Sequence, residues 1–323
     1  MKTGYEVLVA LARRFAFGDV AALVNDPRVE RICTFGQGLL ELDAEDFGAY
    51  DVVDTLKQRA IASRMPQAPR EQPRGALGSL RPAYALLLEV IEARWMRSEM
   101  AALVAAVHIA SEYLPMLVWE PVLGHAADPA RLDHFHDSRF GQMEDRACPH
   151  TRTEKSACAR ALRVATEPPA GWRAYLDRQH SNVAHALGVC AAECRTECPV
   201  TGRLKDGQHE MLGHRAAAAL KFGDSAIVRL RHAAPVGHGF GVPSPEEVAE
   251  AWARTRESLS LSANGNGAGR AILTEDGFPL PGLPSLITAL AGVPIVPDTL
   301  LTDVAAELER CLTLLDSDGK WGA

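Results

Sequence analysis

The chain has 323 residues, of which 47% are hydrophobic and 23% charged, a composition that excludes a wholly disordered protein. Acidic residues outnumber basic ones by 41 to 34, which argues against a surface for nucleic acid, because phosphate binding needs clustered, uncompensated positive charge. The seven cysteines are an odd number, and we expect them to remain thiols or to bind a metal.

The N-terminal region, residues 1–80, is predicted to contain two short helices and a loop. Residues 5–17 place apolar side chains on one side and arginines on the other, which is typical of an amphipathic helix. A second helix is predicted over 51–64. The segment 66–82 is rich in proline, glycine and arginine and has no periodicity, so we expect a loop there. The first residues carry a charge within the first apolar run, and no signal peptide is visible.

The core of the fold is predicted in residues 82–259, where the strongest helix signal lies. No helix breaker occurs between Pro82 and Pro115, and the sequence is apolar nearly all round from 100 to 109. We therefore expect one central buried helix over 82–113. Pro115 and Pro121 lie in the stretch after it, and the element is expected to end with a kink at Gly124 and His125, which places His125 at the mouth of the bundle. The apolar run is too short to span a bilayer, so we expect a cytoplasmic protein that does not contact membranes.

The remainder of the core alternates between an irregular segment and helices. Residues 126–180 lack a sustained period and are predicted to form a long irregular connection with short helices. Residues 244–247, Ser-Pro-Glu-Glu, have the pattern of a capping box and predict the start of a helix that runs to about 259. Further helices are predicted over 181–198, 208–222 and 224–232.

The C-terminal part, residues 260–323, is predicted to be a linker followed by a wrapping segment. Residues 260–269 are rich in glycine, serine and asparagine, as flexible linkers are. Five prolines between 279 and 297 predict an extended chain, and 303–315 predicts a closing helix. No alternating, β-branched strands are found, so the expected class is all-α, with residues 1–323 as one helical domain.

A glycine-rich turn follows the helix predicted over 224–232. Pro235 stops that helix, which places His232 in its last turn. Gly237, Gly239 and Gly241 alternate through the next turn and allow the backbone to pass close to a flat or bulky group. A ligand pocket is one structure with this requirement. A structural glycine loop with a histidine at the helix C-terminus is the other.

Three cysteines suggest an alternative function. Cys190, Cys194 and Cys198 follow one another at four-residue intervals, which places them along one stripe of a helix. With His185 or His209 their thiolates could complete a zinc or cluster site. Structural zinc usually takes ligand pairs from tight turns, and this segment has a helical pattern, so reduced thiols are the favoured interpretation. A zinc- or metal-binding helical protein is the alternative.

Histidines on separate helices could hold a flat cofactor between them, and a helical bundle with inward histidines is a usual way to hold heme. Residues 107–119, with the pattern His-x-x-x-Glu near a tryptophan, and residues 228–232 with the following glycine turn resemble the histidine-ligated heme-dependent aromatic oxygenases. These form the all-helical superfamily of tryptophan 2,3-dioxygenase, and a branch of it hydroxylates L-tyrosine in antibiotic biosynthesis. The likeness covers about a fifth of the chain.

The resemblance implies heme b as the cofactor, with His232 as the axial iron ligand. The turn containing Gly237, His238, Gly239 and Gly241 would line the heme edge. Two departures from the family matter. The dioxygenases' Gly-Thr-Gly-Gly turn is replaced by Gly-His-Gly-Phe-Gly, and the His-x-x-x-Cys of the relatives with covalent heme is absent.

The resemblance also implies a reaction. The protein would hydroxylate an aromatic amino acid, L-tyrosine or a derivative, ortho to the phenol, with hydrogen peroxide or dioxygen as the oxidant. His125 is the expected distal base, with His108 as the second choice. Arg231 or Arg139 would hold the substrate carboxylate through paired hydrogen bonds. The sequence leaves open whether the protein is a monomer or a homodimer.

Overall fold

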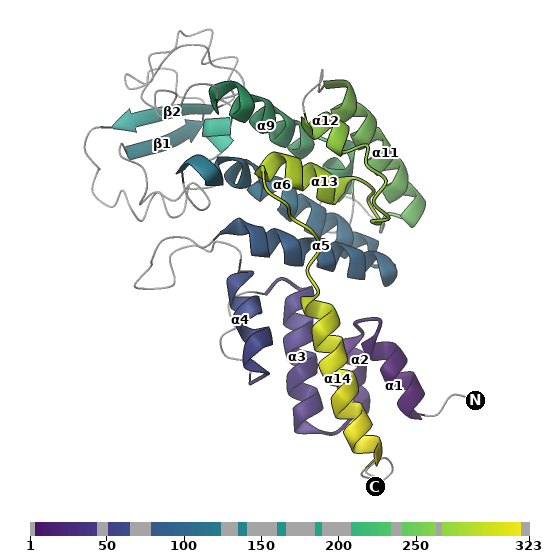
Figure 1. The fold of residues 1–323 in the computed structure, drawn as a ribbon. Helices are drawn as coiled ribbons and strands as arrows, with labels where there is room; N and C mark the ends of the chain where they lie inside the picture. The colour runs from purple at the N-terminus through teal and green to yellow at the C-terminus, as the bar shows by residue number, and fades with distance from the viewer. Residues whose placement is uncertain are drawn as a thin grey trace. The chain divides into compact units, whose positions relative to one another are not determined.

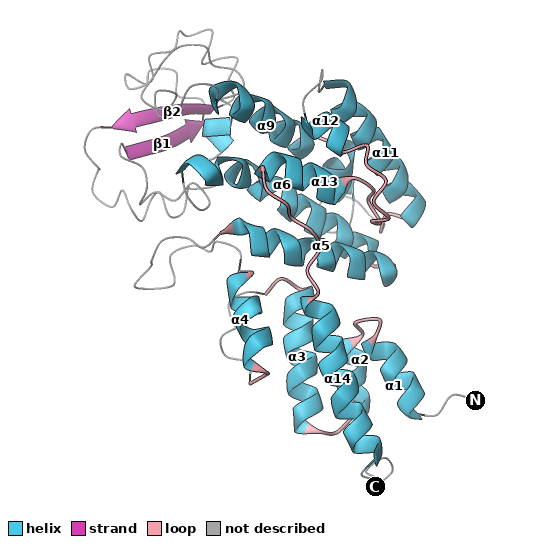
Figure 2. Ribbon diagram, in the orientation of Figure 1, coloured by secondary structure: helices cyan, strands magenta, loops and turns pink. Residues whose placement is uncertain are grey.

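The computed structural model describes residues 4–43, 51–64, 79–123, 135–140, 160–165, 185–188, 208–233, 241–262 and 267–317. These residues are mostly helical, so the predicted all-α class is confirmed (Figure 2). The structure adds one feature to it. Strands β1 (Phe135–Phe140) and β2 (Arg160–Ala165) form a two-stranded antiparallel sheet within the segment predicted to be irregular.

Helices make up most of the described residues. They are α1 (Gly4–Ala12), α2 (Phe17–Leu23), α3 (Pro27–Leu40), α4 (Asp54–Ala62), α5 (Leu80–Met96), α6 (Met100–Leu123), α9 (Gln208–Gly223), α10 (Ala226–Ala233), α11 (Pro245–Ser262), α12 (Gly267–Ala271), α13 (Leu283–Ala291) and α14 (Leu300–Ser317). Residues 185–188 are also helical. Contacts divide the chain into two compact units: unit 1 is Met1–Met65, Arg81–Ala106 and Val296–Ala323, and unit 2 is Pro66–Leu80 and Val107–Ile295.

Unit 1 is built around α14, which lies beside α3 and also contacts α1 and α4 although the sequence separates them widely (Figure 1). Its core contains Phe17, Phe35, Leu39 and Leu308, all fully buried. Burial of each such side chain contributes about 1.5–3 kcal/mol relative to exposure. The predicted helices at 51–64 and 303–315 are confirmed as α4 and α14.

Two N-terminal helices differ from the expectation. The helix predicted over 5–17 is too long, because Phe15 takes the left-handed conformation at φ 57° and separates α1 from α2. No helix was predicted where α3 lies, yet its start has a clear signal. Asp26 is the N-cap and accepts hydrogen bonds from the amides of Arg28 and Val29, and Pro27 follows it.

The single helix predicted over 82–113 is wrong, because the chain turns between α5 and α6. Ser98 adopts φ 59°, which no α-helix contains. Glu99 stabilises the turn: its carboxylate pairs with Arg94 and accepts from Nε of Arg97 at 2.7 Å. The break therefore depends on one left-handed residue and on ion pairs, neither of which disturbs the apolar periodicity.

α6 continues through two prolines to Leu123, so the element ends next to Gly124 and His125, as predicted. Its apolar stretch is accordingly longer than the sequence analysis assumed. By length and composition alone, Met100–Val122 could cross a membrane, with a mean hydropathy of 1.6. However, 61% of that window is buried inside the protein, and the core helix of a soluble protein passes the same test.

Helices α9 to α13 pack together in unit 2, with α11 in contact with α9, α10 and α12, and α13 in contact with α9 and α12 (Figure 1). The predicted capping box at the start of α11 is confirmed. The amide of Ser244 donates to Oε2 of Glu247 at 2.8 Å, and the amide of Glu247 donates to Oγ of Ser244 at 3.2 Å. The helix predicted over 208–222 is confirmed as α9.

The linker and wrapping segment predicted after residue 260 are partly wrong, because α12 and α13 lie there. Gly282, at φ 85°, turns the chain into α13, and Pro284 occupies its first turn. The carboxylate of Asp276 accepts from the amides of Phe278 and Gly282, both at 3.2 Å. A proline in a first helical turn favours the helix, so the proline count did not distinguish α13 from an extended chain.

A buried glutamate caps α14 from a distant part of unit 1. Glu89 of α5 is 4% exposed. It accepts from the amide of Leu301 at 2.9 Å, and from the amide and hydroxyl of Thr302 at 3.0 and 3.1 Å. Burial raises the pKa of Glu89 to about 7, and Asp298 raises it further, while the hydrogen bonds oppose this shift.

The raised pKa predicts a pH-dependent stability. Because folded Glu89 binds its proton more tightly than the unfolded chain does, its contribution to stability is complete below about pH 4.5. That contribution is lost as pH rises through about 7. We expect Glu89→Gln to remove this dependence, which is on the order of 2 kcal/mol. Urea unfolding of both proteins at pH 5 and pH 8 measures it, and parallel pH profiles would contradict the assignment.

Candidate functional site

Half of the residues predicted to form the heme site lie outside the described residues, namely His125, Gly237, His238 and Gly239. The cysteines of the alternative metal site, at 190, 194 and 198, also lie outside them. Arg139 lies in β1. Gly241 is described and adopts φ 117°, a conformation that favours glycine.

The structure places the backbone of His232 in the last turn of α10, as predicted. Arg231 precedes it and is partly buried. α10 is fixed to α11 at its start, where the amide of Ile227 donates to Oγ1 of Thr255 at 3.1 Å. Thr255 is fully buried and donates in turn to the carbonyl of Ala251 at 2.8 Å. The helix that carries His232 is therefore anchored within unit 2.

His108, the second choice for a distal base, lies in α6 and interacts with its own helix. Its Nε2 lies 3.1 Å from Oε1 of Glu112, one turn later, and its side chain is 14% exposed. Across the ranges that the structure describes, no group of three or more histidine, cysteine, aspartate or glutamate side chains could hold a metal ion.

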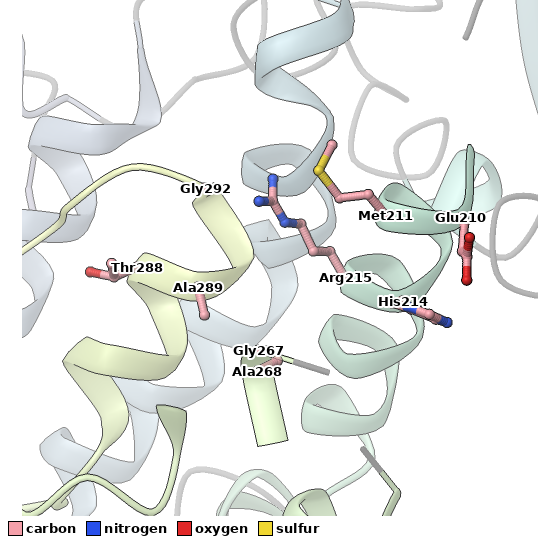
Figure 3. A pocket seen from close by; sticks show the side chains of 9 residues that line it. All are labelled: Glu210, Met211, His214, Arg215, Gly267, Ala268, Thr288, Ala289 and Gly292. Carbon is pink, nitrogen blue, oxygen red and sulfur yellow. The ribbon is translucent and has the colours of Figure 1, made fainter. Parts of the chain in front are cut away.

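A different site is formed by α9, α12 and α13. Between these helices lies a pocket of about 590 Å³, shown in Figure 3. It is called the Arg215 pocket below. It is lined by Glu210, Met211, His214, Arg215, Gly267, Ala268, Thr288, Ala289 and Gly292.

Arg215 is the cation of this pocket, and no described residue balances its charge. Its side chain is partly buried, and burial lowers the pKa of the guanidinium. Within the described part of the chain, Arg215 makes no ion pair and no hydrogen bond through its side chain. By contrast Arg94, Arg97 and Arg256, whose side chains are also mostly covered, each pair with a glutamate. Arg215 is therefore held partly out of water with no anionic partner in the ranges that the structure describes.

Gly292 determines where the guanidinium can lie. It follows the last turn of α13 at φ 73°, and its amide donates to the carbonyl of Thr288 at 2.9 Å. A Cβ atom on Gly292 would lie 2.8 Å from Nη2 and 2.9 Å from Cζ of Arg215. Only glycine leaves room for the guanidinium against the end of α13.

The other walls are mainly apolar. Met211 and Arg215 extend from the same side of α9 toward α13, whereas Glu210 and His214 point away from Arg215 (Figure 3). The hydroxyl of Thr288 donates to the carbonyl of Ile295 at 3.0 Å and accepts from its amide at 2.9 Å. Its proton is therefore already used in a hydrogen bond within the protein. Beside the guanidinium, Met211, Ala268 and Ala289 therefore offer carbon surface.

Sequence reasoning missed this site. Arg215 follows a segment that attracts notice for its histidines, and an arginine on an amphipathic helix is ordinarily solvated. One signal was present: Gly292 follows an apolar run at the spacing of a helix C-cap. That signal predicts the end of a helix. It does not predict that the guanidinium of Arg215 lies against that end.

Comparison with known proteins gives no relative. No protein-family model, no curated protein and no solved structure matches the chain. The case for a functional site therefore rests on the residues of the protein itself.

Proposed function

We propose that the protein binds a small organic anion in the Arg215 pocket, and that Arg215 is the residue that binds its charge. One observation carries the proposal: a partly buried guanidinium borders a cavity and has no anionic partner among the described residues. Partial burial of a charge is unfavourable, and a paired anion offsets that cost. The planar guanidinium matches a carboxylate through two parallel hydrogen bonds.

The dimensions of the pocket support this function. A volume of about 590 Å³ lies within the range of sites for small molecules, about 300–1,000 Å³. Such sites combine mostly apolar walls with a few polar groups that orient the ligand. In the Arg215 pocket, Met211, Ala268 and Ala289 supply the apolar surface and Arg215 supplies the charge.

Benzoate is a suitable first probe, because it joins one carboxylate to an apolar ring. We expect benzoate at about 100 times its dissociation constant to raise the unfolding temperature by about 2–6 °C. Arg215→Met should abolish this rise. Arg254→Met is the matched control, since Arg254 is exposed on α11 and pairs only with Glu250 among the described residues. An equal rise in all three proteins, measured by thermal unfolding, would contradict the proposal.

A heme-dependent oxygenase is the second candidate function, and the position of His232 at the end of the anchored helix α10 favours it. An imidazole is a suitable axial ligand, so His232 would hold heme b, which when bound supplies activation of hydrogen peroxide or dioxygen. Arg231 or Arg139 would orient the carboxylate of an aromatic amino acid such as L-tyrosine. His125 would accept a proton from the oxidant.

Two substitutions separate the roles in this candidate. His232→Ala should abolish heme binding and with it the absorbance band near about 400 nm, because the axial bond is lost. His125→Ala should retain heme and slow hydroxylation by about 10²–10⁴-fold. Purified wild-type protein without heme would refute this candidate. Stoichiometric zinc that is lost on serine replacement of Cys190, Cys194 and Cys198 would instead support the metal-binding alternative.

A further inference from the structure

The charge of the Arg215 pocket restricts the charge of its ligand. Arg215 is the single arginine or lysine among the nine described lining residues. One guanidinium balances one negative charge. A second negative charge on the ligand would meet no further arginine or lysine among the described lining residues, and its burial there would be unfavourable.

The walls restrict the remainder of the ligand. Met211, Ala268 and Ala289 present carbon, and the hydroxyl of Thr288 already bonds to both backbone groups of Ile295. A ligand rich in hydroxyl or amide groups would lose its hydrogen bonds to water and gain few in return. An apolar body gains from the same burial, and the flexible thioether of Met211 can adapt to its shape.

Gly292 adds a geometric requirement. The guanidinium occupies the space that a Cβ atom on this residue would fill. Any side chain there pushes the guanidinium away from the end of α13, while its charge remains in the protein. The position of Arg215, and not only its charge, therefore depends on Gly292.

We infer that the ligand of the Arg215 pocket is a monocarboxylate with an apolar body, and that Gly292 is a positioning residue that aligns the guanidinium with the carboxylate. This inference rests on the proposed binding function and names its ligand class. It predicts that the pocket distinguishes ligands by their net charge and by their apolar surface. A nonspecific basic patch would not make this distinction.

Isothermal titration calorimetry with four probes tests the ligand class. Benzoate has one carboxylate and a ring, acetate lacks the ring, phthalate adds a second carboxylate, and inorganic phosphate has neither carboxylate nor ring. We expect benzoate to bind at least about 10-fold more tightly than each of the others, the discrimination expected from a lost apolar surface or an unpaired charge. Phosphate or phthalate binding as tightly as benzoate would overturn the ligand class and leave anion binding intact.

Two variants test the geometry. Arg215→Lys retains the charge but removes the planar fork, and should weaken benzoate binding about 10- to 100-fold. Gly292→Ala should weaken it about 10-fold, and Arg254→Met should leave it unchanged. If Gly292→Ala does not fold, Gly292→Asn places a Cβ atom at the same point in a residue that tolerates the left-handed conformation better, and tests the same alignment. Benzoate affinity that is unaffected in a folded variant overturns the alignment, whereas no binding by any probe overturns the proposed function as well.

Discussion

We expect Gly282→Ala to lower the free energy of unfolding by more than about 3 kcal/mol. Gly282 adopts φ 85°, and a Cβ atom there would contact the carbonyl oxygen of Ile272 and lie 2.6 Å from its carbonyl carbon. Neither backbone is free to move. The amide of Gly282 donates to Asp276 at 3.2 Å, and the carbonyl of Ile272 accepts from Nε of Arg256 at 3.0 Å.

Gly277→Ala is the matched control for this prediction. Gly277 also lies in the left-handed region, at φ 74°, but nothing lies within 4 Å of an added Cβ atom. Its replacement should cost only the backbone strain, about 1–2 kcal/mol. Urea unfolding followed by circular dichroism compares the two variants. A cost for Gly282→Ala no greater than that for Gly277→Ala would show that the Ile272 carbonyl is not the obstacle.

The second large effect is expected in unit 1, at Gly36. Alanine has a more favourable helix propensity than glycine by about 1 kcal/mol. By propensity alone, Gly36→Ala would therefore stabilise α3. However, the new Cβ atom would lie 2.7 Å from the ring of Phe17, which is fully buried between helices. Overpacking of this kind costs about 1–3 kcal/mol, and we expect the net effect to be destabilising by about 1–2 kcal/mol.

A double-mutant cycle tests the cause. Phe17→Leu removes ring atoms at the point of contact, so Gly36→Ala should cost less in that background than in the wild type. Gly18→Ala provides the comparison on α2, where the nearest atom is 4.0 Å from the added Cβ, and it should be neutral or stabilising. Equal costs of Gly36→Ala in both backgrounds, by chemical unfolding, would exclude the Phe17 contact as the cause.

Local signals explain which parts of the fold could be predicted from the sequence. The start of α11 depends on Ser244 and Glu247, two residues one turn apart, and α9 and α14 show an unbroken apolar period. The break at Ser98 and the helix after Gly282 depend on left-handed residues fixed by side chains from neighbouring turns. Such contacts leave little trace in periodicity, which explains why these predictions failed.

The packing of helices distant in sequence was also beyond prediction. Unit 1 joins three separate segments, and α14 lies beside α3 although about 260 residues separate them. The candidate site also depends on contacts between helices that are distant in sequence. The sequence contains Arg215, but the contact of its guanidinium with Gly292 arises only when α9 packs against α13.

The most direct test of the central claim is the NMR signal of the Arg215 side-chain Nε–Hε group during a titration with benzoate. Its loss in Arg215→Lys assigns the signal in the full-length protein. A carboxylate that accepts from this guanidinium must change its chemical environment, so we predict a shift that saturates with benzoate concentration. Arg254, exposed on α11, should show no such shift. An Arg215 signal that remains unchanged while benzoate binds would contradict the assignment of Arg215 as the anion-binding residue.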